Sequence, residues 1–207
     1  MPARESFLFQ TRPIAAPGLR VGLLGGSFDP AHGGHRHISR VALKRLRLDR
    51  VWWLLSPGNP LKPNPPASLE RRLDAARRVI DGHPRILATG IERDLGTVYT
   101  IDTLGALMIR YPAVRFVWLM GADNLSDFHR WHRWADIMQA LPVAVMARPG
   151  EQVRAGLSKA ARRFAASRIP ERDAAALPFR AAPCWSMLTH AMSPLSSTAL
   201  RASGAWA

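Results

Sequence analysis

Apolar residues follow two patterns that alternate along the chain. Short continuous apolar runs are typical of buried strands, and between them lie segments in which apolar residues recur every three or four positions, as on one face of a helix. This alternation predicts an α/β fold, a single Rossmann-like, doubly wound domain with a mainly parallel sheet. The predicted strands are Val21–Leu24, Val51–Leu55, Ile86–Thr89, Val114–Met120, Val143–Met146 and Cys184–Leu188. The predicted helices are His35–Leu46, Ser68–Ile80, Thr100–Ile109, one closed by Asp136–Leu141, and Ser196–Arg201.

Turn-forming residues follow four of the predicted strands. Ligands of open parallel sheets bind at the carboxyl ends of the strands, so we expect a site where these turns meet. The proline-rich stretch 57–66 is predicted to be a loop, because proline lacks a backbone donor and restricts the chain. The turns are Gly25-Gly26, Pro57-Gly58, Gly121 and Arg148-Pro149-Gly150.

Length and composition narrow the class of protein. The chain has 207 residues, 47% of them hydrophobic, which fits one domain with a full core. No apolar run approaches the roughly 20 residues of a membrane span, so no membrane association is expected. Residues 1–19 are predicted to form a loosely ordered extension and residues 20–207 the domain. The single cysteine, Cys184, cannot form an internal disulfide, which favours a cytoplasmic protein with Cys184 in the core.

The chain is strongly basic. It carries 29 Lys and Arg residues against 15 Asp and Glu residues, a net charge of +14. Such an excess attracts polyanions, either nucleic acid or phosphorylated metabolites. Nucleic acid is disfavoured because no recognisable nucleic-acid-binding motif accompanies the charge. Part of the charge is expected on a solvated helix face: Arg71, Arg72, Arg77 and Arg78.

The turn after the first predicted strand contains candidate chemistry. Its sequence, GGSFDPAHGGH, spans Gly25 to His35. Glycine lets backbone N–H groups approach a ligand, and the entrance of the next helix adds free N–H groups and a positive dipole end. His32 and His35 are placed to donate hydrogen bonds to phosphate oxygens. Zinc binding with Asp29 is an alternative, disfavoured because a zinc site needs a further ligand; a purely structural role for the histidines is another.

A second constellation lies near the end of the chain. A serine is expected to cap the last predicted helix, after which Ser197, Thr198 and Arg201 share one face. Hydroxyl groups, free backbone donors and a guanidinium group would then converge on one point, which suits a polyphosphate.

Together the two segments resemble the nucleotidyltransferase superfamily with H-x-G-H and S-S-T-x-x-R motifs, and within it the bacterial nicotinate-nucleotide adenylyltransferases. The resemblance runs from about Val21 to Arg201. The chain has Leu61 where this family often has a histidine before the lysine matching Lys62, and it ends at Ala207, whereas the family usually continues further. The supporting stretches are Asn59-Pro60-Leu61-Lys62, Tyr99–Leu104, Gly121-Ala122-Asp123, Trp131 and Arg148-Pro149-Gly150.

The resemblance implies adenylyl transfer from ATP to nicotinic acid mononucleotide. It implies His32 and His35 as catalytic residues, and Mg²⁺ held mainly by ATP phosphates, with no metal site made by the protein. For Trp131, stacking on the pyridine ring competes with packing in a helix stripe that includes Trp134. The implied ATP-binding residues are Gly25, Ser27, Phe28, His32, His35, Lys62, Ser197, Thr198 and Arg201. The implied mononucleotide-binding residues are Gly26, Ser27, Thr100, Asp123 and Trp131.

Three alternatives remain at this point. Pantetheine-phosphate adenylyltransferases are shorter, usually have threonine at the position of His32 and lack the segment 121–131. A nucleic-acid-binding protein on the same fold is suggested only by the charge. An inactive relative is disfavoured because His32, His35 and Arg201 are all present. The sequence leaves open whether the chain forms a homo-oligomer.

Overall fold

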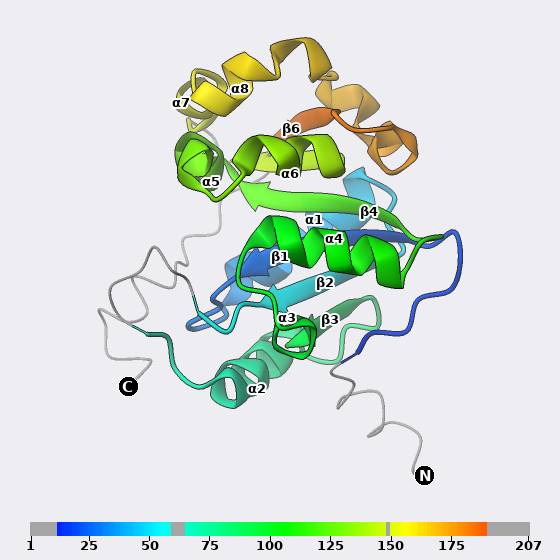
Figure 1. Ribbon diagram of the computed structural model, residues 1–207, viewed down its shortest axis with the longest axis vertical. Coiled ribbons are helices and arrows are strands. Elements are labelled where there is room, and N and C mark those ends of the chain that lie inside the picture. Colours follow the sequence, from blue (N-terminus) through cyan, green and yellow to red (C-terminus); the bar gives the residue numbers. More distant parts are fainter. Residues whose placement is uncertain (1–11, 59–64, 148–149, 190–207) are drawn as a thin grey trace.

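The protein is built on one parallel sheet of six strands in the order β3-β2-β1-β4-β5-β6. The computed structural model describes residues 12–58, 65–147 and 150–189, and Figure 1 shows the sheet at its centre. All neighbouring strands pair in parallel, and the order reverses between β1 and β4, so the predicted doubly wound α/β fold is confirmed. The strands are β1 (Arg20–Gly26), β2 (Arg50–Leu55), β3 (Ile86–Thr89), β4 (Arg115–Gly121), β5 (Val143–Ala147) and β6 (Trp185–Thr189).

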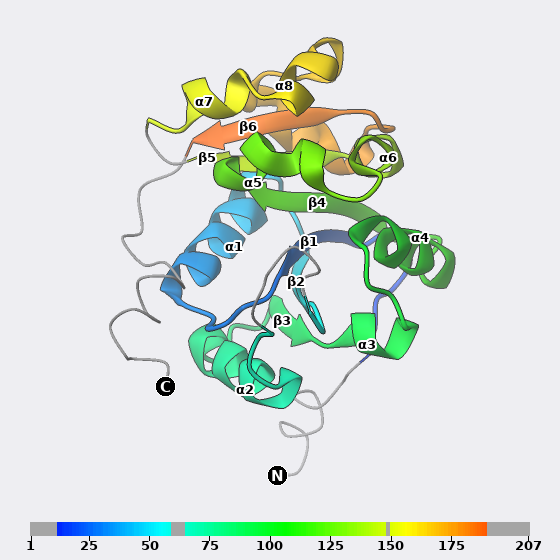
Figure 2. The same cartoon turned by 60° about the vertical axis from the view of Figure 1, so that its left-hand side comes forward.

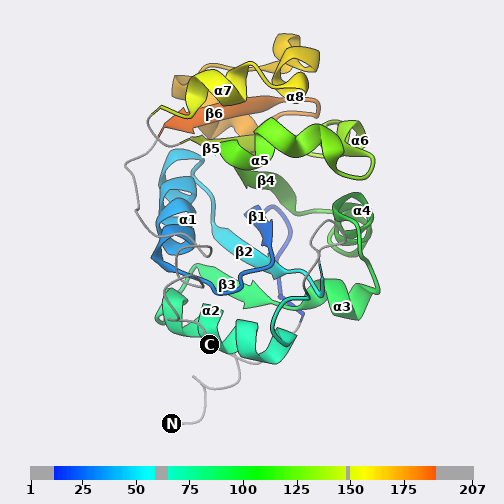
Figure 3. The same ribbon diagram turned by 90° about the vertical axis from the view of Figure 1, so that its left-hand side faces the viewer.

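Helices cover both faces of the sheet (Figure 3). One face is covered by α1 (Gly33–Arg45), α2 (Leu69–Ile80) and the 3₁₀ segment η4 (Glu171–Phe179). The other is covered by α3 (Ile91–Leu95), α4 (Thr100–Arg110), α5 (Ala122–Asp127), α6 (Trp134–Ala140), α7 (Gln152–Gly156) and α8 (Lys159–Arg163). Two further 3₁₀ segments are η2 (Phe128–Arg130) and η3 (Ala165–Ser167).

The strands feed two cores because their side chains alternate between the faces. On β2, Trp52 and Leu54 enter the core beneath α4, whereas Trp53 enters the core beneath α1 and α2. All three side chains are at most 1% exposed. A strand buried on both sides produces the continuous apolar run from which it was predicted.

Two predicted helix starts are reproduced in detail. Ser68 caps α2, with its hydroxyl accepting a hydrogen bond from the Arg71 N–H at 3.3 Å. Helix α4 begins at Thr100 and has Asp102 in its first turn, where the helix dipole favours a carboxylate. The predicted helix Ser196–Arg201 lies outside the described residues.

The described part of the segment before β1 contacts the domain. The Tyr111 hydroxyl donates to the Pro13 carbonyl at 2.6 Å, and the Gly18 N–H donates to the Ala113 carbonyl at 2.7 Å. The boundary between residues 19 and 20 stays a prediction. Among the described residues, none of the helices has the length and apolar character to span a bilayer.

Between β5 and β6 the chain makes an excursion that contains α7, α8, η3 and η4. Figure 2 shows α7 and α8 beside β6, the strand that ends the sheet. Cys184, directly before β6, is buried as predicted.

Candidate active site

The turn between β1 and α1 lies at the carboxyl end of the sheet, where the strand order reverses. This is the position at which open α/β sheets bind ligands. The turn contains Ser27, Phe28 and His32, and His35 lies in the first turn of α1, so the structure brings this predicted group together.

His32 and His35 form the N-terminal cap of α1 by reciprocal hydrogen bonds. Nδ1 of His32 accepts from the Gly34 N–H at 3.1 Å, and Nδ1 of His35 accepts from the His32 N–H at 3.2 Å. The two rings lie 3.9 Å apart between centroids. A ring nitrogen that accepts a hydrogen bond carries no proton, so the proton of each neutral ring resides on Nε2. The cap therefore makes both histidines Nε2–H donors.

His35 is held neutral. Burial of its ring, and then the neighbouring His32, lower the pKa of His35 to about 3. An imidazole with such a pKa is uncharged at neutral pH. Its only available chemistry there is hydrogen-bond donation through Nε2, because Nδ1 is occupied by the backbone.

Aromatic rings pack against the ring of His35. Phe28 stacks on Trp53 at 5.1 Å and contacts the His35 ring at 4.7 Å. The Trp53 indole N–H donates to the Ser39 hydroxyl at 2.7 Å, and that hydroxyl donates to the His35 carbonyl at 2.8 Å. Phe28 has a φ of 47°, which costs a non-glycine residue about 1–3 kcal/mol. Phe28 is 2% exposed, so its ring supports His35 and offers little surface to a ligand.

The interpretation of Arg72 as part of a solvated helix face is wrong. Arg72 is 1% exposed, and its guanidinium group donates to four backbone carbonyls, those of Ser27 and Ala67 at 2.7 Å, of Ser56 at 2.8 Å and of Pro57 at 3.4 Å. These carbonyls belong to the turns after β1 and β2 and to the segment before α2. Arg72 therefore joins three segments of the site. Its neighbour Arg71 is exposed as predicted.

A buried carboxyl group accompanies Arg72. Glu92, in α3 just after β3, is 7% exposed. Burial raises the pKa of Glu92 to about 7, and the positive charge of Arg72 opposes that rise. Burial likewise lowers the pKa of Arg72, against the charges of Asp29, Glu70 and Glu92. Sequence reasoning missed this pair, because Arg71 and Arg72 look alike in the sequence and Glu92 lies in a short charged helix.

Two segments that contain predicted mononucleotide-binding residues are joined by a contact between aromatic rings that the sequence did not suggest. The rings of Tyr99 and His132 lie 4.2 Å apart, which brings the start of α4 beside Trp131. Trp131 is half-buried and packs edge-to-face on Phe128 at 5.2 Å. The structure thus leaves Trp131 with both a packing contact and exposed surface.

Two glycines shape the floor of the site. A Cβ at Gly121 would lie 2.2 Å from Oδ1 of Asp123, so glycine permits this carboxylate to fold back over the end of β4. A Cβ at Gly25 would lie 2.3 Å from the Trp118 ring. Packing of β1 against β4 therefore requires glycine at position 25, whereas Gly26 is less confined, with Phe28 at 3.4 Å.

Four of the predicted ATP-binding residues cannot be placed. Lys62, Ser197, Thr198 and Arg201 lie outside the described residues. The described residues place Ser27, Phe28, His32 and His35 between the end of β1 and the first turn of α1. Thr100 begins α4, Asp123 follows the end of β4, and Trp131 follows η2.

Comparisons with known proteins identify similar chains. The model of the cytidylyltransferase-like family matches residues 23–203. A protein of Cereibacter sphaeroides named "Probable nicotinate-nucleotide adenylyltransferase" is 61% identical over 90% of this chain and 98% of its own length. A protein of the same name from Methylorubrum extorquens is 54% identical over 88% of this chain and 99% of its own. The solved structure of Plasmodium falciparum nicotinic acid mononucleotide adenylyltransferase complexed with NaAD has the same fold, with a TM-score of 0.68 at 14% identity over 89% of this chain and 83% of that one.

Proposed function

We propose that this chain, which belongs to the cytidylyltransferase-like family and within it to the nicotinate-nucleotide adenylyltransferases, transfers the adenylyl group of ATP to nicotinic acid mononucleotide. The products are nicotinic acid adenine dinucleotide, a precursor of NAD, and pyrophosphate. The observation that carries the mechanism is the reciprocal cap of His32 and His35, which fixes two Nε2–H donors at the entrance of α1.

The reaction needs no covalent nucleophile from the protein. The phosphate of the mononucleotide is largely a dianion at neutral pH, since its second pKa is near 6. One of its oxygens attacks the α-phosphorus of ATP, the bond from that phosphorus to the bridging oxygen breaks, and pyrophosphate leaves with the electron pair. The protein aligns the reactants and stabilises charge on the phosphate oxygens as it develops.

The histidine cap suits this task. The Nε2–H groups of His32 and His35 donate to oxygens of the α- and β-phosphates, and the free N–H groups of α1 add to them. Because the Nδ1 hydrogen bonds fix the rings, little reorganisation is needed when charge develops. From the family motif we assign Lys62 to the triphosphate, and Ser197, Thr198 and Arg201 to its β- and γ-phosphates.

Magnesium is proposed to enter with ATP. Mg²⁺ binds nucleotides through phosphate oxygens and keeps several water ligands. The histidine turn presents N–H donors, which complement phosphate oxygens and leave the metal to the nucleotide and water. The metal supplies neutralisation of phosphate charge.

The pyridine mononucleotide is proposed to bind at Trp131 and the start of α4. The exposed surface of Trp131 stacks on the pyridine ring. Helix α4 has no side-chain cap, so the N–H groups of Thr100 and Ile101 are available for the nicotinate carboxylate. Asp123 is an acceptor only, which suits a sugar hydroxyl. Ser27 and Gly26, at the end of β1, are proposed to contact the mononucleotide between these groups.

The test is a direct assay of the purified protein. It is incubated with ATP, Mg²⁺ and one acceptor at a time: nicotinic acid mononucleotide, nicotinamide mononucleotide or phosphopantetheine. Pyrophosphate and the matching dinucleotide are then measured. We expect the fastest turnover with nicotinic acid mononucleotide. Turnover with phosphopantetheine alone would contradict the proposal. We also propose that the enzyme acts in the cytoplasm.

A further inference from the structure

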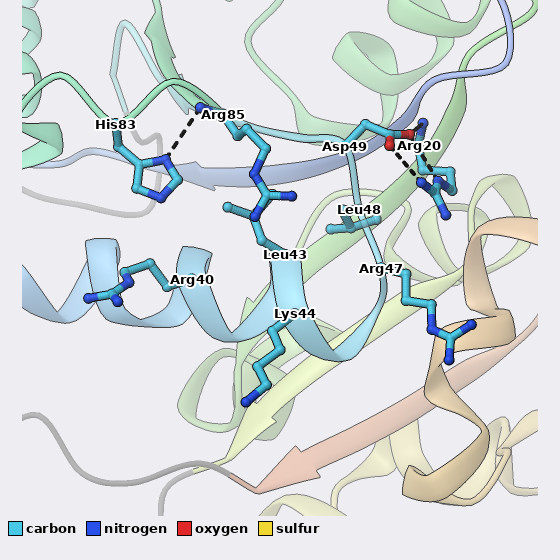
Figure 4. Close-up of a pocket in the computed structure, with 9 residues that line it drawn as sticks. All are labelled: Arg20, Arg40, Leu43, Lys44, Arg47, Leu48, Asp49, His83 and Arg85. Atoms are coloured by element: carbon cyan, nitrogen blue, oxygen red, sulfur yellow. Dashed lines mark hydrogen bonds and ion pairs between the residues drawn. The ribbon is translucent and has the colours of Figure 1, made fainter.

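A basic cavity lies at the amino ends of the strands, whereas the histidine turn lies at their carboxyl ends. It has a volume of about 570 Å³ and is lined by residues from the starts of β1 and β3 and from the second half of α1 (Figure 4). Arg40 and Lys44 come from α1, Arg47 from the turn after it, and His83 and Arg85 from the turn before β3. None of these residues belongs to the candidate active site.

The lining of this cavity contains more cationic than acidic side chains. Asp49, the one acidic residue among the described residues of the lining, already accepts hydrogen bonds from Nε and Nη2 of Arg20 at 2.9 and 2.6 Å. Arg40, Lys44 and Arg85 form no ion pair with any described residue. The cavity therefore gathers positive charge that the described part of the chain does not neutralise.

These cations act on one another. Nδ1 of the His83 ring accepts a hydrogen bond from the Arg85 N–H at 3.3 Å. Burial, and then Arg85, Arg36 and Arg40, lower the pKa of His83. The surroundings thus resist one more positive charge, and a bound anion would relieve that repulsion.

Helix capping accounts for only part of this cluster. Cations in the last turn of a helix offset the negative end of its dipole, which explains Lys44 and Arg45. Arg45 is moreover paired with Glu171 at 2.8 Å. Capping does not explain Arg40, one turn earlier, or Arg85, which comes from another segment.

We propose that this cavity is a second anion site, which binds the polyphosphate group of a small phosphorylated molecule. Its volume falls in the range of small-molecule sites, roughly 300–1,000 Å³. Leu43 and Leu48, the apolar residues of the lining, are only 3% and 1% exposed, so the accessible surface of the cavity is mainly that of its charged side chains, which suits a polyphosphate. Single-stranded nucleic acid fits less well, because such sites stack bases on aromatic side chains and this lining contains no Phe, Tyr or Trp.

The test measures binding of inorganic triphosphate by calorimetry, with no reaction involved, so it stands even if the proposed function fails. The variant Arg40→Gln/Arg85→Gln removes two charges from the cavity. The control Lys159→Gln/Arg162→Gln removes two from exposed positions on α8. We expect the cavity variant to lose one class of sites or at least tenfold in affinity, and the control to stay within twofold of the original protein.

Three results would overturn the proposal. Equal binding by the cavity variant and the control would place all triphosphate binding elsewhere. Equal weakening of both would show a general effect of net charge. Binding of single-stranded RNA that depends on Arg40 and Arg85, rises with RNA length and resists competition by triphosphate would make the cavity part of a nucleic-acid surface. If the double variant melts early, the single changes Arg40→Gln and Arg85→Gln should each weaken binding about threefold or more.

Discussion

The two ends of helix α1 handle negative charge in different ways. At its start, His32 and His35 are positioned by backbone hydrogen bonds, His35 is neutral, and the helix dipole assists an anion. At its end the dipole opposes an anion, and Arg40, Lys44 and Arg85 supply full charges instead. The helix has 13 residues, so the ends lie about 20 Å apart. The start of α1 offers donors in a fixed geometry, which suits a reaction, whereas the end of α1 attracts anions by its full positive charges.

The largest effect is expected from a substitution at the start of α1, where backbone hydrogen bonds position the two histidines. His35→Ala should lower kcat by on the order of 10²–10³, because one preorganised donor to the phosphates is lost. The fold should persist, as judged by thermal melting. The matched control is His83→Ala at the other end of α1, which should leave kcat within about twofold. Near-normal turnover of His35→Ala would refute its catalytic role.

The next effect concerns the support of the histidine turn. Arg72→Met should lower the free energy of unfolding by about 2–3 kcal/mol, because the carbonyls of Ser27, Ser56 and Ala67 lose their buried donor. Urea denaturation measures this change. Arg71→Met, at the exposed neighbouring position, should change stability by less than about 0.5 kcal/mol. Equal effects of the two variants would contradict the role of Arg72.

A smaller effect is expected on the pyridine side. Trp131→Ala should raise the KM for nicotinic acid mononucleotide about tenfold, because stacking is worth about 1 kcal/mol or more. The KM for ATP should be unchanged, and the preference for the acid over the amide should persist, since backbone donors read the carboxylate. Trp131→Phe should keep much of the binding. Unfolding of Trp131→Ala would instead identify the ring as a packing residue.

The smallest effect concerns the pH dependence of stability, to which the buried groups Glu92 and His35 contribute with opposite signs. The pKa of Glu92 is raised to about 7 in the folded protein, against about 4.3 in the unfolded chain, so stability falls as pH rises through that window. The pKa of His35 is lowered to about 3, against about 6.5 unfolded, so stability falls as pH decreases through that window.

Glu92→Gln should therefore gain at least about 1 kcal/mol in relative stability between pH 4.5 and pH 7.5, measured by urea denaturation at both values. The exposed Glu70, whose pKa is lowered by hydrogen bonds to its own backbone and to Arg93, provides the control. Glu70→Gln should show no such gain. A flat profile for Glu92→Gln would show that folding does not raise the pKa of Glu92.

The strands could be predicted from the sequence because burial on both faces leaves a visible apolar run, as in Val51–Leu55 and Val143–Met146. Helix starts were visible where a serine cap or a glycine-rich turn preceded them. Helices α3, α5, α7 and α8 were not predicted, because five or six residues make too few turns for a period to show.

The site was predictable in its chemistry but not in its supports. The spacing of His32 and His35 indicated two donors at a helix entrance. It did not reveal that each ring caps the backbone, because N-terminal caps ordinarily use serine, threonine, aspartate or asparagine. Arg72 was misassigned because its partners at Ser27 and Ser56 lie 45 and 16 residues away in the chain. Only the folded sheet brings those carbonyls to it.

The histidine cap also defines what an inhibitor of this turn must look like. Both Nε2–H groups and the backbone N–H groups of α1 are donors, and His35 carries no charge. A compound that presents an amine or an amidine there would place its own hydrogen-bond donors against those of the protein, and both sets would stay unpaired. Uncharged acceptors, such as a sulfonyl or a phosphinate ester, can satisfy the same hydrogen bonds without the charge that keeps phosphate analogues out of cells.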